Sequence, residues 1–212
     1  MKVVMVGCSH KETSIAVRER LAFPTDQVRL ALQQFRERFP QHEAVLLSTC
    51  NRTEFYVTAA DDAVPLSTAE AIRFLAESRG LDPATIAGEL TEREGPRAIA
   101  HLFSVAASLD SMVIGEAQIL SQVKQAYEMA CDVQDSMSTA HALFQRAIRV
   151  AKRVASETRI HERRISVPSV AISELATQIF ERFDDKTILV VGAGEMAEET
   201  LTYLTDYGAR RI

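Results

Sequence analysis

An apolar run and an alternating run, on either side of a short polar segment, constrain the fold of this chain more than any other feature. Residues 44–47 are entirely apolar, and residues 54–58 alternate between polar and apolar side chains. Ser48-Thr49-Cys50-Asn51-Arg52 stands between them. Runs of this length and pattern predict β-strands. We therefore predict two strands joined by a loop that carries Cys50, and strand-end loops are where scaffolds present reactive side chains.

Strands and helices alternate through the first 95 residues. The predicted strands cover residues 2–7, 44–47, 54–58 and 89–94, the last of them charged and placed at a sheet edge. The predicted helices start at Thr13 or Ser14, at Thr25, and at the capping box of residues 67–70, which leads to a helix ending at Gly80. This order predicts the α/β class, with an α+β domain whose mixed or antiparallel sheet is covered by helices.

The chain becomes almost continuously helical after residue 95. Helices are predicted at 97–107, 118–131 and 138–160, with a break at 109–116. A charged run and Ser166-Val167-Pro168-Ser169 then mark a domain boundary. A helix at 170–183, a strand at 186–191 and a helix to Tyr207 predict the first βα unit of a truncated Rossmann domain. The expected domains are 1–160, including a linking helix, and 161–212.

Composition excludes several classes of protein. The 212 residues carry a formal net charge of −5, so the chain as a whole lacks the basic character of a nucleic-acid binder. Three widely spaced cysteines argue against a disulfide framework and for a reducing compartment. No Cys/His cluster has zinc-ligand spacing, so no metal site is predicted. No signal peptide or membrane span is apparent, and the expected location is the cytoplasm.

Cys50 is the leading candidate for a nucleophile. Its polar neighbours disfavour hydrophobic burial, and the guanidinium of Arg52 favours the thiolate by supplying an opposite charge. The same arginine is equally suited to binding a carboxylate in a bidentate fork. A buried structural thiol remains the alternative. Cys8 is the second candidate, and Cys131 is expected in the core.

Polar groups are spaced through the apolar run at residues 108–122. His101, on the preceding helix, is either a packing residue or, if it faces Cys50, a general acid or base. The polar residues are either helix-end hydrogen-bonding groups or the rim of a substrate pocket: Asp110, Ser111, Glu116, Gln118 and Gln122.

The segment Gly192-x-Gly194-x-x-Ala197 follows a predicted strand and opens a predicted helix. That context is the one a dinucleotide site needs, because the glycines allow a tight turn and close approach of the pyrophosphate to the helix N-terminus. A plain strand-to-helix turn is the alternative. The residue that separates NAD from NADP belongs about 20 positions further on.

Arginine and lysine gather on one predicted helix and just after it. Arg146, Arg149 and Arg153 share a helix face, Lys152 lies beside them, and Arg159, Arg163 and Arg164 follow. This face is either solvated or a track for a phosphate backbone.

Three motifs in this order give the chain a resemblance to a known family. They are Ser48-Thr49-Cys50-Asn51-Arg52, the run from His101-Leu102-Phe103 to Gln122, and the glycine loop. Ile114-Gly115-Glu116-x-Gln118-Ile119-Leu120 is the most specific part. Over its whole length the chain resembles glutamyl-tRNA reductases, which use NADPH to reduce glutamate esterified to tRNA to glutamate 1-semialdehyde, the entry step to tetrapyrroles.

The resemblance implies a role for each motif. Cys50 would attack the aminoacyl carbonyl, expel tRNA and hold glutamate as a thioester, and hydride from NADPH would release the aldehyde. His101 matches a position important for activity, and Arg52 would bind the glutamate side-chain carboxylate. The other implied substrate-binding residues are Thr49, Asn51, Ser111, Glu116, Ala117, Gln118 and Gln122. The implied cofactor-binding residues are Gly192, Ala193, Gly194, Glu195, Met196 and Ala197.

The chain also departs from the family pattern. Family members usually carry glycine where this chain has Ser108, and they continue well beyond residue 212 into the rest of the cofactor domain and a helical dimerisation domain. We therefore expect an N-terminal fragment of a homodimeric enzyme. It is expected to form and hydrolyse the thioester, to reduce it poorly, and to expose an apolar edge at 187–191, either as a monomer or paired through that edge. The implied partners are glutamyl-tRNA and a downstream glutamate-1-semialdehyde aminomutase.

Two functions of other classes stay open. One is a different thiol enzyme, such as an acyl hydrolase, in which the glycine loop serves only as a turn. The other is a non-catalytic regulatory or tRNA-binding module.

Overall fold

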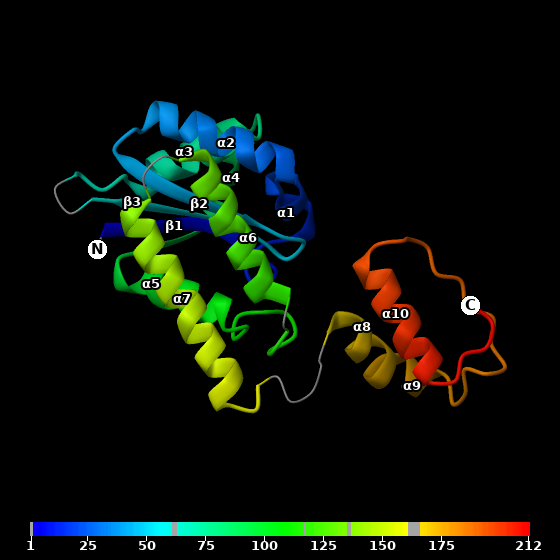
Figure 1. Ribbon diagram of the computed structural model, residues 1–212. Coiled ribbons are helices and arrows are strands. Elements are labelled where there is room, and N and C mark those ends of the chain that lie inside the picture. Colours follow the sequence, from blue (N-terminus) through cyan, green and yellow to red (C-terminus); the bar gives the residue numbers. More distant parts are fainter. Residues whose placement is uncertain (1, 61–62, 117, 135–136, 161–165) are drawn as a thin grey trace.

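A four-stranded antiparallel sheet organises most of the computed structural model, which describes residues 2–60, 63–116, 118–134, 137–160 and 166–212 (Figure 1). The strands are β1 (Lys2–Ser9), β2 (His42–Ser48), β3 (Arg52–Ala59) and β4 (Thr91–Glu94), in the order β2-β3-β1-β4. β4 pairs only with β1, so its predicted edge position is confirmed. The antiparallel sheet and the mixed α/β class are confirmed as well.

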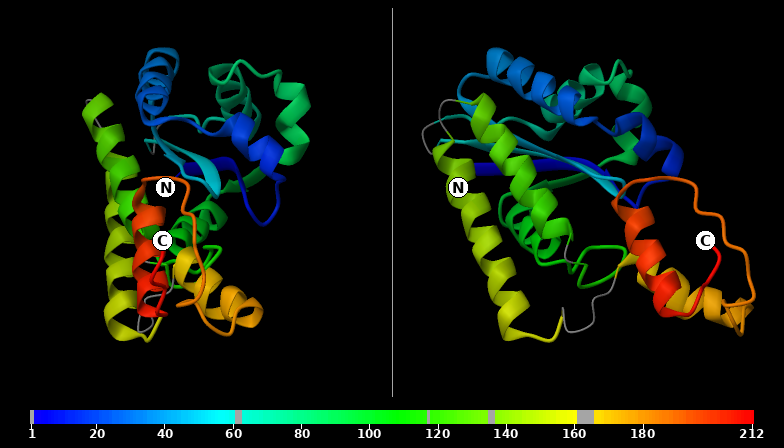
Figure 2. Two further views of the ribbon diagram at one scale, coloured as in Figure 1. Left: turned by 90° about the vertical axis from the view of Figure 1, so that its right-hand side faces the viewer. Right: turned by 45° about the vertical axis from the view of Figure 1, so that its right-hand side comes forward.

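Helices cover both faces of this sheet (Figures 1 and 2). One face packs against α2 (Thr25–Arg38) and α3 (Thr68–Ser78). The other packs against α5 (Pro96–Ala106), α6 (Gln118–Val133) and α7 (Ser138–Glu157). The predicted capping box starts α3, where the Ser67 hydroxyl accepts a hydrogen bond from the Glu70 amide at 3.2 Å. Shorter helices complete this part: α1 (Ile15–Leu21), α4 (Pro83–Ile86) and the 3-10 turn η1 (Ala87–Glu89).

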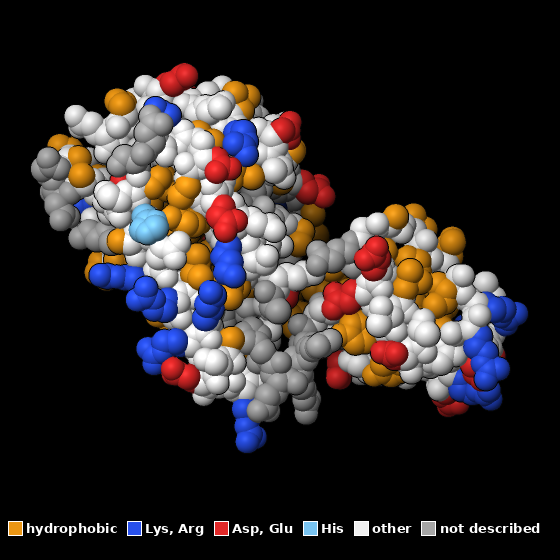
Figure 3. Space-filling view, viewed as in Figure 1, with side chains coloured by type: hydrophobic (Ala, Val, Ile, Leu, Met, Phe, Trp, Pro, Cys, Tyr) orange, Lys and Arg blue, Asp and Glu red, His pale blue; other side chains and the backbone are white. Residues whose placement is uncertain are grey.

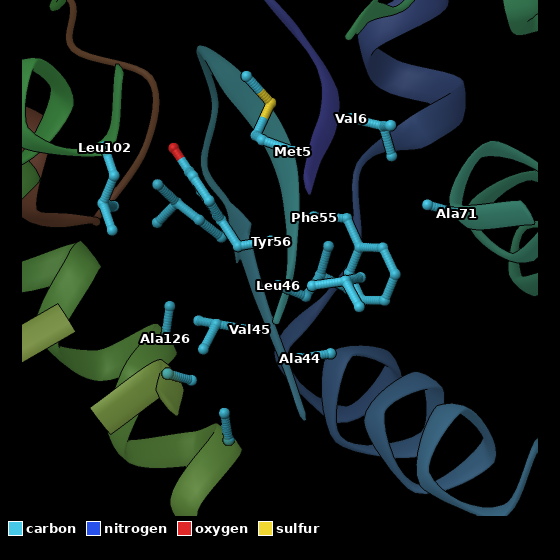
Figure 4. Packing of buried hydrophobic residues seen from close by; sticks show 14 of the residues in the cluster. Met5, Val6, Ala44, Val45, Leu46, Phe55, Tyr56, Ala71, Leu102 and Ala126 are labelled. Atoms are coloured by element: carbon cyan, nitrogen blue, oxygen red, sulfur yellow. The ribbon is translucent and has the colours of Figure 1, made fainter. Parts of the chain in front are cut away.

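Alternate residues of β3 build the two halves of the core, because successive side chains of a strand point to opposite faces. Phe55 packs edge-on against Phe35 of α2, with ring centroids 5.1 Å apart. Tyr56 points the other way and meets Phe144 of α7 at 5.7 Å. Figure 4 shows Phe55 and Tyr56 leaving the strand in opposite directions, with Leu102 on the tyrosine side. We call residues 2–157 the sheet unit.

Residues 166–212, the C-terminal segment, pack around a much smaller core of Ile172, Phe183 and Leu204. Its helical elements are α8 (Val167–Val170), the π-helical turn η2 (Ala171–Ala176), α9 (Thr177–Ile179) and α10 (Glu195–Asp206). The helix predicted at 170–183 thus begins and ends earlier, since Ser166 and Ser169 form a capping box in place of a break.

The strand predicted at 186–191 is wrong. It is reduced to one parallel bridge, between Thr187 and Arg211. A strand needs a hydrogen-bonded neighbour, and among the described residues the one bridge to this stretch comes from Arg211. Leu189 and Val191 are 86% and 90% exposed, which confirms the predicted exposure of an apolar stretch here.

Two further expectations can be compared with the structure. Cys131 was predicted in the core and is exposed, because it lies on the outer side of α6 near the end of that helix. Within the described ranges, no helix has the length and apolar character that crossing a membrane requires.

Candidate active site

Several hydrogen bonds to its backbone hold the loop that carries Cys50 between β2 and β3. The Thr49 amide donates to the Arg52 carbonyl at 2.8 Å, and the Thr49 hydroxyl accepts from the amides of Asn51 and Arg52, each at 3.2 Å. Arg18 donates to the Cys50 carbonyl at 3.0 Å. The Cys50 side chain itself is exposed. The loop therefore offers an accessible thiol on a fixed backbone, and a buried structural role for Cys50 is excluded.

Arg52, two residues further on, is a buried arginine with two carboxylate partners. Its side chain is 2% exposed. Nη1 lies 2.7 Å from Oε1 of Glu54 and 3.1 Å from Oδ2 of Asp110, and Nη2 donates to the Asp110 carbonyl at 2.6 Å. These bonds engage three of the five N–H donors of the guanidinium. Nε–H and one Nη2–H are left without a partner among the described residues.

Glu54 is the centre of this network. Its carboxylate is 2% exposed and accepts hydrogen bonds from Arg52, from the Tyr56 hydroxyl at 2.6 Å and from Nε2 of His101 at 2.9 Å. Burial raises the pKa of Glu54, but the His101 hydrogen bond and the Arg52 charge outweigh it and leave the pKa below its ordinary value. Burial and the Glu54 charge raise the pKa of Tyr56 well above its ordinary value. Glu54 is thus a buried carboxylate that stays ionised.

Asp110 connects the network to the surface. It is 21% exposed and receives Lys11 at 2.5 Å in addition to Arg52. Burial raises the pKa of Asp110, and the Lys11 hydrogen bond and the Arg52 charge lower it further than burial raises it. The ion pairs run from exposed Lys11 through Asp110 and Arg52 to Glu54.

Residues 107–116 follow α5 and form one wall of the site. Ser108 adopts φ 60°, and its hydroxyl donates to the Glu116 carbonyl. Gly115 adopts φ 89°, and a Cβ at this position would collide with the backbone oxygen of Ile160. The loop therefore contains one serine in the left-handed conformation. It also needs glycine at position 115, where it packs against the backbone of Ile160, just after α7.

A pocket of about 50 Å³ joins this wall to the Cys50 loop. Most of the residues predicted for substrate binding line it: Thr49, Asn51, Arg52, Ser111, Glu116, Gln118 and Gln122, together with Cys50. Ala117 lies outside the described residues. Val167 and Met196 of the C-terminal segment line the same pocket, and Met196 belongs to the predicted cofactor loop. Residues distant in the sequence thus meet around one thiol.

His101 does not line this pocket. Its Nε2 is bonded to Glu54, and it lines a separate small hollow with Cys8 and Ser9. Cys8 is buried, and burial raises the pKa of its thiol. The second candidate nucleophile is therefore shielded from solvent, and His101 is connected to the Cys50 pocket through its hydrogen bond to Glu54, which in turn bonds Arg52.

Glu116 supplies a carboxyl group to the lining of the pocket, and its surroundings favour the protonated form. Burial raises its pKa above the ordinary value, Glu199 raises it further, and Arg52 partly opposes both. A raised pKa makes the protonated form of this carboxyl group easier to reach.

The backbone of the predicted cofactor loop is open around both of its glycines. Gly192 adopts φ 131°, and a Cβ built on Gly192 or Gly194 would meet no atom within 4 Å. No side chain caps α10, which begins directly after Gly194. The open backbone and the uncapped helix start fit a pyrophosphate. Ala193 and Ala197 belong to the same turn and first helical turn, and Glu195 is the first residue of α10.

Three residues of the network were missed by the sequence analysis: Lys11, Glu54 and Tyr56. A signal for two of them was present. Arg52, Glu54 and Tyr56 alternate in a strand and therefore share one face, and two ionisable groups on the inner face of a strand next to a candidate nucleophile indicate a buried polar network. Lys11 and Asp110 lie 99 positions apart, and only the fold brings them together.

Comparison with known proteins agrees with this arrangement. The family model described as the N-terminal domain of glutamyl-tRNAGlu reductase matches residues 6–158, and the shikimate / quinate 5-dehydrogenase model matches residues 174–212. The glutamyl-tRNA reductase of Rhodopirellula baltica is 47% identical over all of this chain and 50% of its own length. That of Rubrobacter xylanophilus is 42% identical over all of this chain and 48% of its own length.

A solved structure is similar as well. Glutamyl-tRNA reductase from Methanopyrus kandleri superimposes with a TM-score of 0.66 at 38% identity, covering 98% of this chain and 47% of that protein. The chain thus spans about half the length of the relatives that it matches. Since the family model accounts for most of the sheet unit, the chain belongs to the glutamyl-tRNA reductase family.

Proposed function

We propose that the protein transfers the glutamyl group of glutamyl-tRNA to Cys50 and reduces it with NADPH to glutamate 1-semialdehyde, the first step toward 5-aminolevulinate and tetrapyrroles. The observation that carries this proposal is the pocket around Cys50. It combines an exposed thiol with Arg52, whose unpartnered Nε–H and Nη2–H are the pair of donors that a carboxylate fork requires.

The first step forms a thioester. The Cys50 thiolate attacks the ester carbonyl carbon, a C–S bond forms, and the C–O bond to the terminal ribose breaks. The electron pair leaves on the ribose oxygen, which must gain a proton. Glu116 is the group we assign to deliver it, because it lines the pocket and its pKa is raised. A thioester is more readily reduced by hydride than the starting ester, which gives the covalent step its purpose.

Arg52 selects the substrate and Glu54 holds Arg52 in place. The glutamate side-chain carboxylate would bind the unpartnered N–H donors, while Asp110 and Glu54 fix the guanidinium from the other side. His101 supports the same arrangement through Glu54. In this proposal His101 is a positioning residue and not the base that removes the thiol proton.

The C-terminal segment would hold the cofactor at Gly192, Ala193, Gly194, Glu195, Met196 and Ala197. NADPH, when bound there, would supply the hydride that converts the glutamyl thioester to the aldehyde. The division into a catalytic domain at 1–160 and a cofactor domain at 161–212 is part of this proposal. It is supported by the separate cores of the two parts.

The tRNA would lie along α7. Arg146, Arg149 and Lys152 are exposed on this helix, and Figure 3 shows Lys and Arg side chains gathered over it. Arg153 is also exposed but is engaged with Glu157. Arg163 and Arg164 lie outside the described residues. Transfer of the labile aldehyde to a glutamate-1-semialdehyde aminomutase and homodimer formation by the longer protein belong to the same proposal.

The experiment that tests this function is the trapping of the acyl-enzyme. We expect intact-mass spectrometry of the chain after incubation with glutamyl-tRNA to show one glutamyl adduct, located on Cys50. Cys50→Ser should lose the thioester, whereas Cys131→Ser, which removes the other exposed thiol, should keep it. An adduct that survives in Cys50→Ser or forms on Cys131 would contradict the proposal.

The same experiment separates the two other functions. A general acyl hydrolase would acylate Cys50 equally well from glutaminyl and glutamyl esters, because it has no use for the Arg52 fork. A binding module without catalysis would bind glutamyl-tRNA with unchanged affinity in Cys50→Ala and would show no adduct at any time.

A further inference from the structure

A second hollow lies next to the Cys50 pocket, and the two share a side chain. It has a volume of about 120 Å³ and lies between the start of α2, the end of β2 and the first half of α6. Gln122 lines both hollows. Ser48 lines the second, and its neighbour Thr49 lines the first. The two hollows are therefore neighbours near the end of β2.

The walls of this hollow suit a flat heteroaromatic ring. Its floor is apolar and includes Phe23, Val28 and Leu46, with Met129 at the side. The amides of Gln122 and Gln125 supply hydrogen-bonding groups from α6. None of the lining residues is charged, so the hollow favours neither a phosphate nor a carboxylate. An apolar floor takes a ring face, and a glutamine amide pairs with the edge of adenine through one donor and one acceptor.

The position of the hollow follows the geometry of the reaction. An ester has two halves, joined at the carbonyl that Cys50 attacks. With the acyl half held toward Arg52, the alcohol half must leave on another side of the thiol. Ser48 lies two residues before Cys50, so their Cα atoms are at most about 7.6 Å apart. One sugar ring spans that separation between an ester oxygen and a base.

We propose that this hollow binds the adenine ring of the 3′-terminal nucleoside of the aminoacylated tRNA. The proposal rests on the proposed function and adds to it a subsite for the leaving group. Gln122 then contacts both halves of the substrate, while Gln125 and Met129 contact only the nucleoside. The scissile bond is held from both ends across Cys50.

Three glutamyl esters test the subsite: glutamyl-tRNA, the 3′-glutamyl ester of adenosine, and glutamate α-ethyl ester, which has no base. The rate of Cys50 acylation is measured by intact mass for the wild-type chain, Gln125→Ala and Gln34→Ala, an exposed glutamine of α2 that serves as control. We expect Gln125→Ala to slow acylation by both adenosine-bearing esters about tenfold, the effect of losing one amide–base pair. The ethyl ester should be unaffected, and Gln34→Ala should behave as wild type with all three.

A binding measurement that needs no turnover gives a second readout. Adenosine is titrated into the chain labelled with ¹³C at the methionine methyl groups. We expect the Met129 signal to move through the ring current of the bound base, and the signal of Met5, which is buried in the sheet, to stay in place. Uridine at equal concentration should move Met129 less.

The outcomes separate this subsite from the function on which it rests. Equal slowing of all three esters by Gln125→Ala, slowing of none, or an unmoved Met129 signal would overturn the subsite alone. Absence of any acylation of wild-type Cys50 would overturn the proposed function and the subsite with it.

Discussion

The sheet unit and the C-terminal segment place their ionic and apolar groups in opposite ways. The sheet unit buries an ion pair between Arg52 and Glu54, both side chains 2% exposed, within a continuous core. The C-terminal segment has its own arginine–carboxylate pair, Arg182 with Asp184, but at the surface. Its apolar residues Leu189 and Val191 are almost fully exposed.

The difference shows what a core makes available for chemistry. Desolvated charges are stable only when several partners satisfy them, and the sheet unit provides those partners from β3, α5, the turn after β1 and the loop after α5. The C-terminal segment instead presents open backbone at Gly192 and Gly194. A site that needs fixed charges belongs to the first part, and a site that needs exposed amides belongs to the second.

Removing Glu54 should produce the largest effect. Glu54→Ala leaves Arg52 buried with one carboxylate partner in place of two, and we expect the free energy of unfolding to fall by about 3–5 kcal/mol. Asp184→Ala, the matched change in the C-terminal segment, should leave stability nearly unchanged because its pair is solvated. Urea denaturation measures both, and equal effects would contradict the contrast between the two parts.

The same residue predicts a pH dependence. Because the folded pKa of Glu54 lies below its unfolded value, its contribution is complete above the unfolded pKa and is lost as the pH falls through the folded one. We expect Glu54→Gln to remove part of the acid destabilisation. Wild type and Glu54→Gln should therefore differ most at neutral pH and converge in acid, as followed by the urea midpoint at successive pH values.

One leucine in each part allows the contribution of apolar side chains to stability to be compared directly. Leu46 is 1% exposed and Leu189 is 86% exposed. We expect Leu46→Ala to cost about 2–5 kcal/mol, the range for truncating a buried leucine. Leu189→Ala should change the stability by less than about 0.5 kcal/mol. A large loss in Leu189→Ala would mean that this side chain is buried in solution.

At Ser108, a smaller effect on stability can be separated into backbone strain and a side-chain hydrogen bond. A left-handed conformation costs a residue with a Cβ about 1–2 kcal/mol, and the hydroxyl bond to Glu116 returns about 0.5–1.5 kcal/mol. Ser108→Gly removes both the strain and the hydrogen bond, and these two effects oppose each other. Its free energy of unfolding should therefore lie within about 1 kcal/mol of the wild-type value. Ser108→Ala keeps the strain and loses the bond, so it should be the less stable variant. The reverse order in thermal denaturation would exclude strain at this position.

Charge reversal on α7 should leave folding intact and change only binding. We expect Arg146→Glu with Arg149→Glu to weaken glutamyl-tRNA binding and to flatten its salt dependence, since each lost phosphate contact lowers the slope by nearly one. Arg210→Glu, on the exposed surface of the C-terminal segment, is the control. Unchanged affinity of the double variant would identify the α7 face as merely solvated.

The sequence predicted most of the sheet unit because its signals are local. Alternation in β3, the Ser67 capping box and the helical spacing of Phe35 each specify an element without reference to distant residues. The strand at 186–191 failed because pairing is not local: an apolar run forms a strand only beside another strand. Cys131 failed because an apolar neighbourhood in sequence does not say which side of a helix faces the core.

The sequence indicated which residues line the site, but it did not indicate the electrostatic interactions among them. Cys50, Arg52 and the polar residues up to Gln122 were readable from their types and spacing. The sequence could not show that Arg52 is buried, that His101 faces Glu54, or that Lys11 reaches Asp110. These depend on the register of β1 against β3 and on the path of the loop after α5.

The three cysteines differ in exposure, and this difference decides which of them a covalent reagent can modify. Cys8 is shielded by the sheet, so an electrophile in solution meets only Cys50 and Cys131. A neutral reagent has little reason to discriminate between the two. A reagent with a carboxylate placed like that of glutamate gains the unpartnered donors of Arg52 at Cys50 and finds no arginine lining a pocket at Cys131 among the described residues. The residue that we propose to select the substrate thus also provides a design rule for a site-directed inhibitor or label.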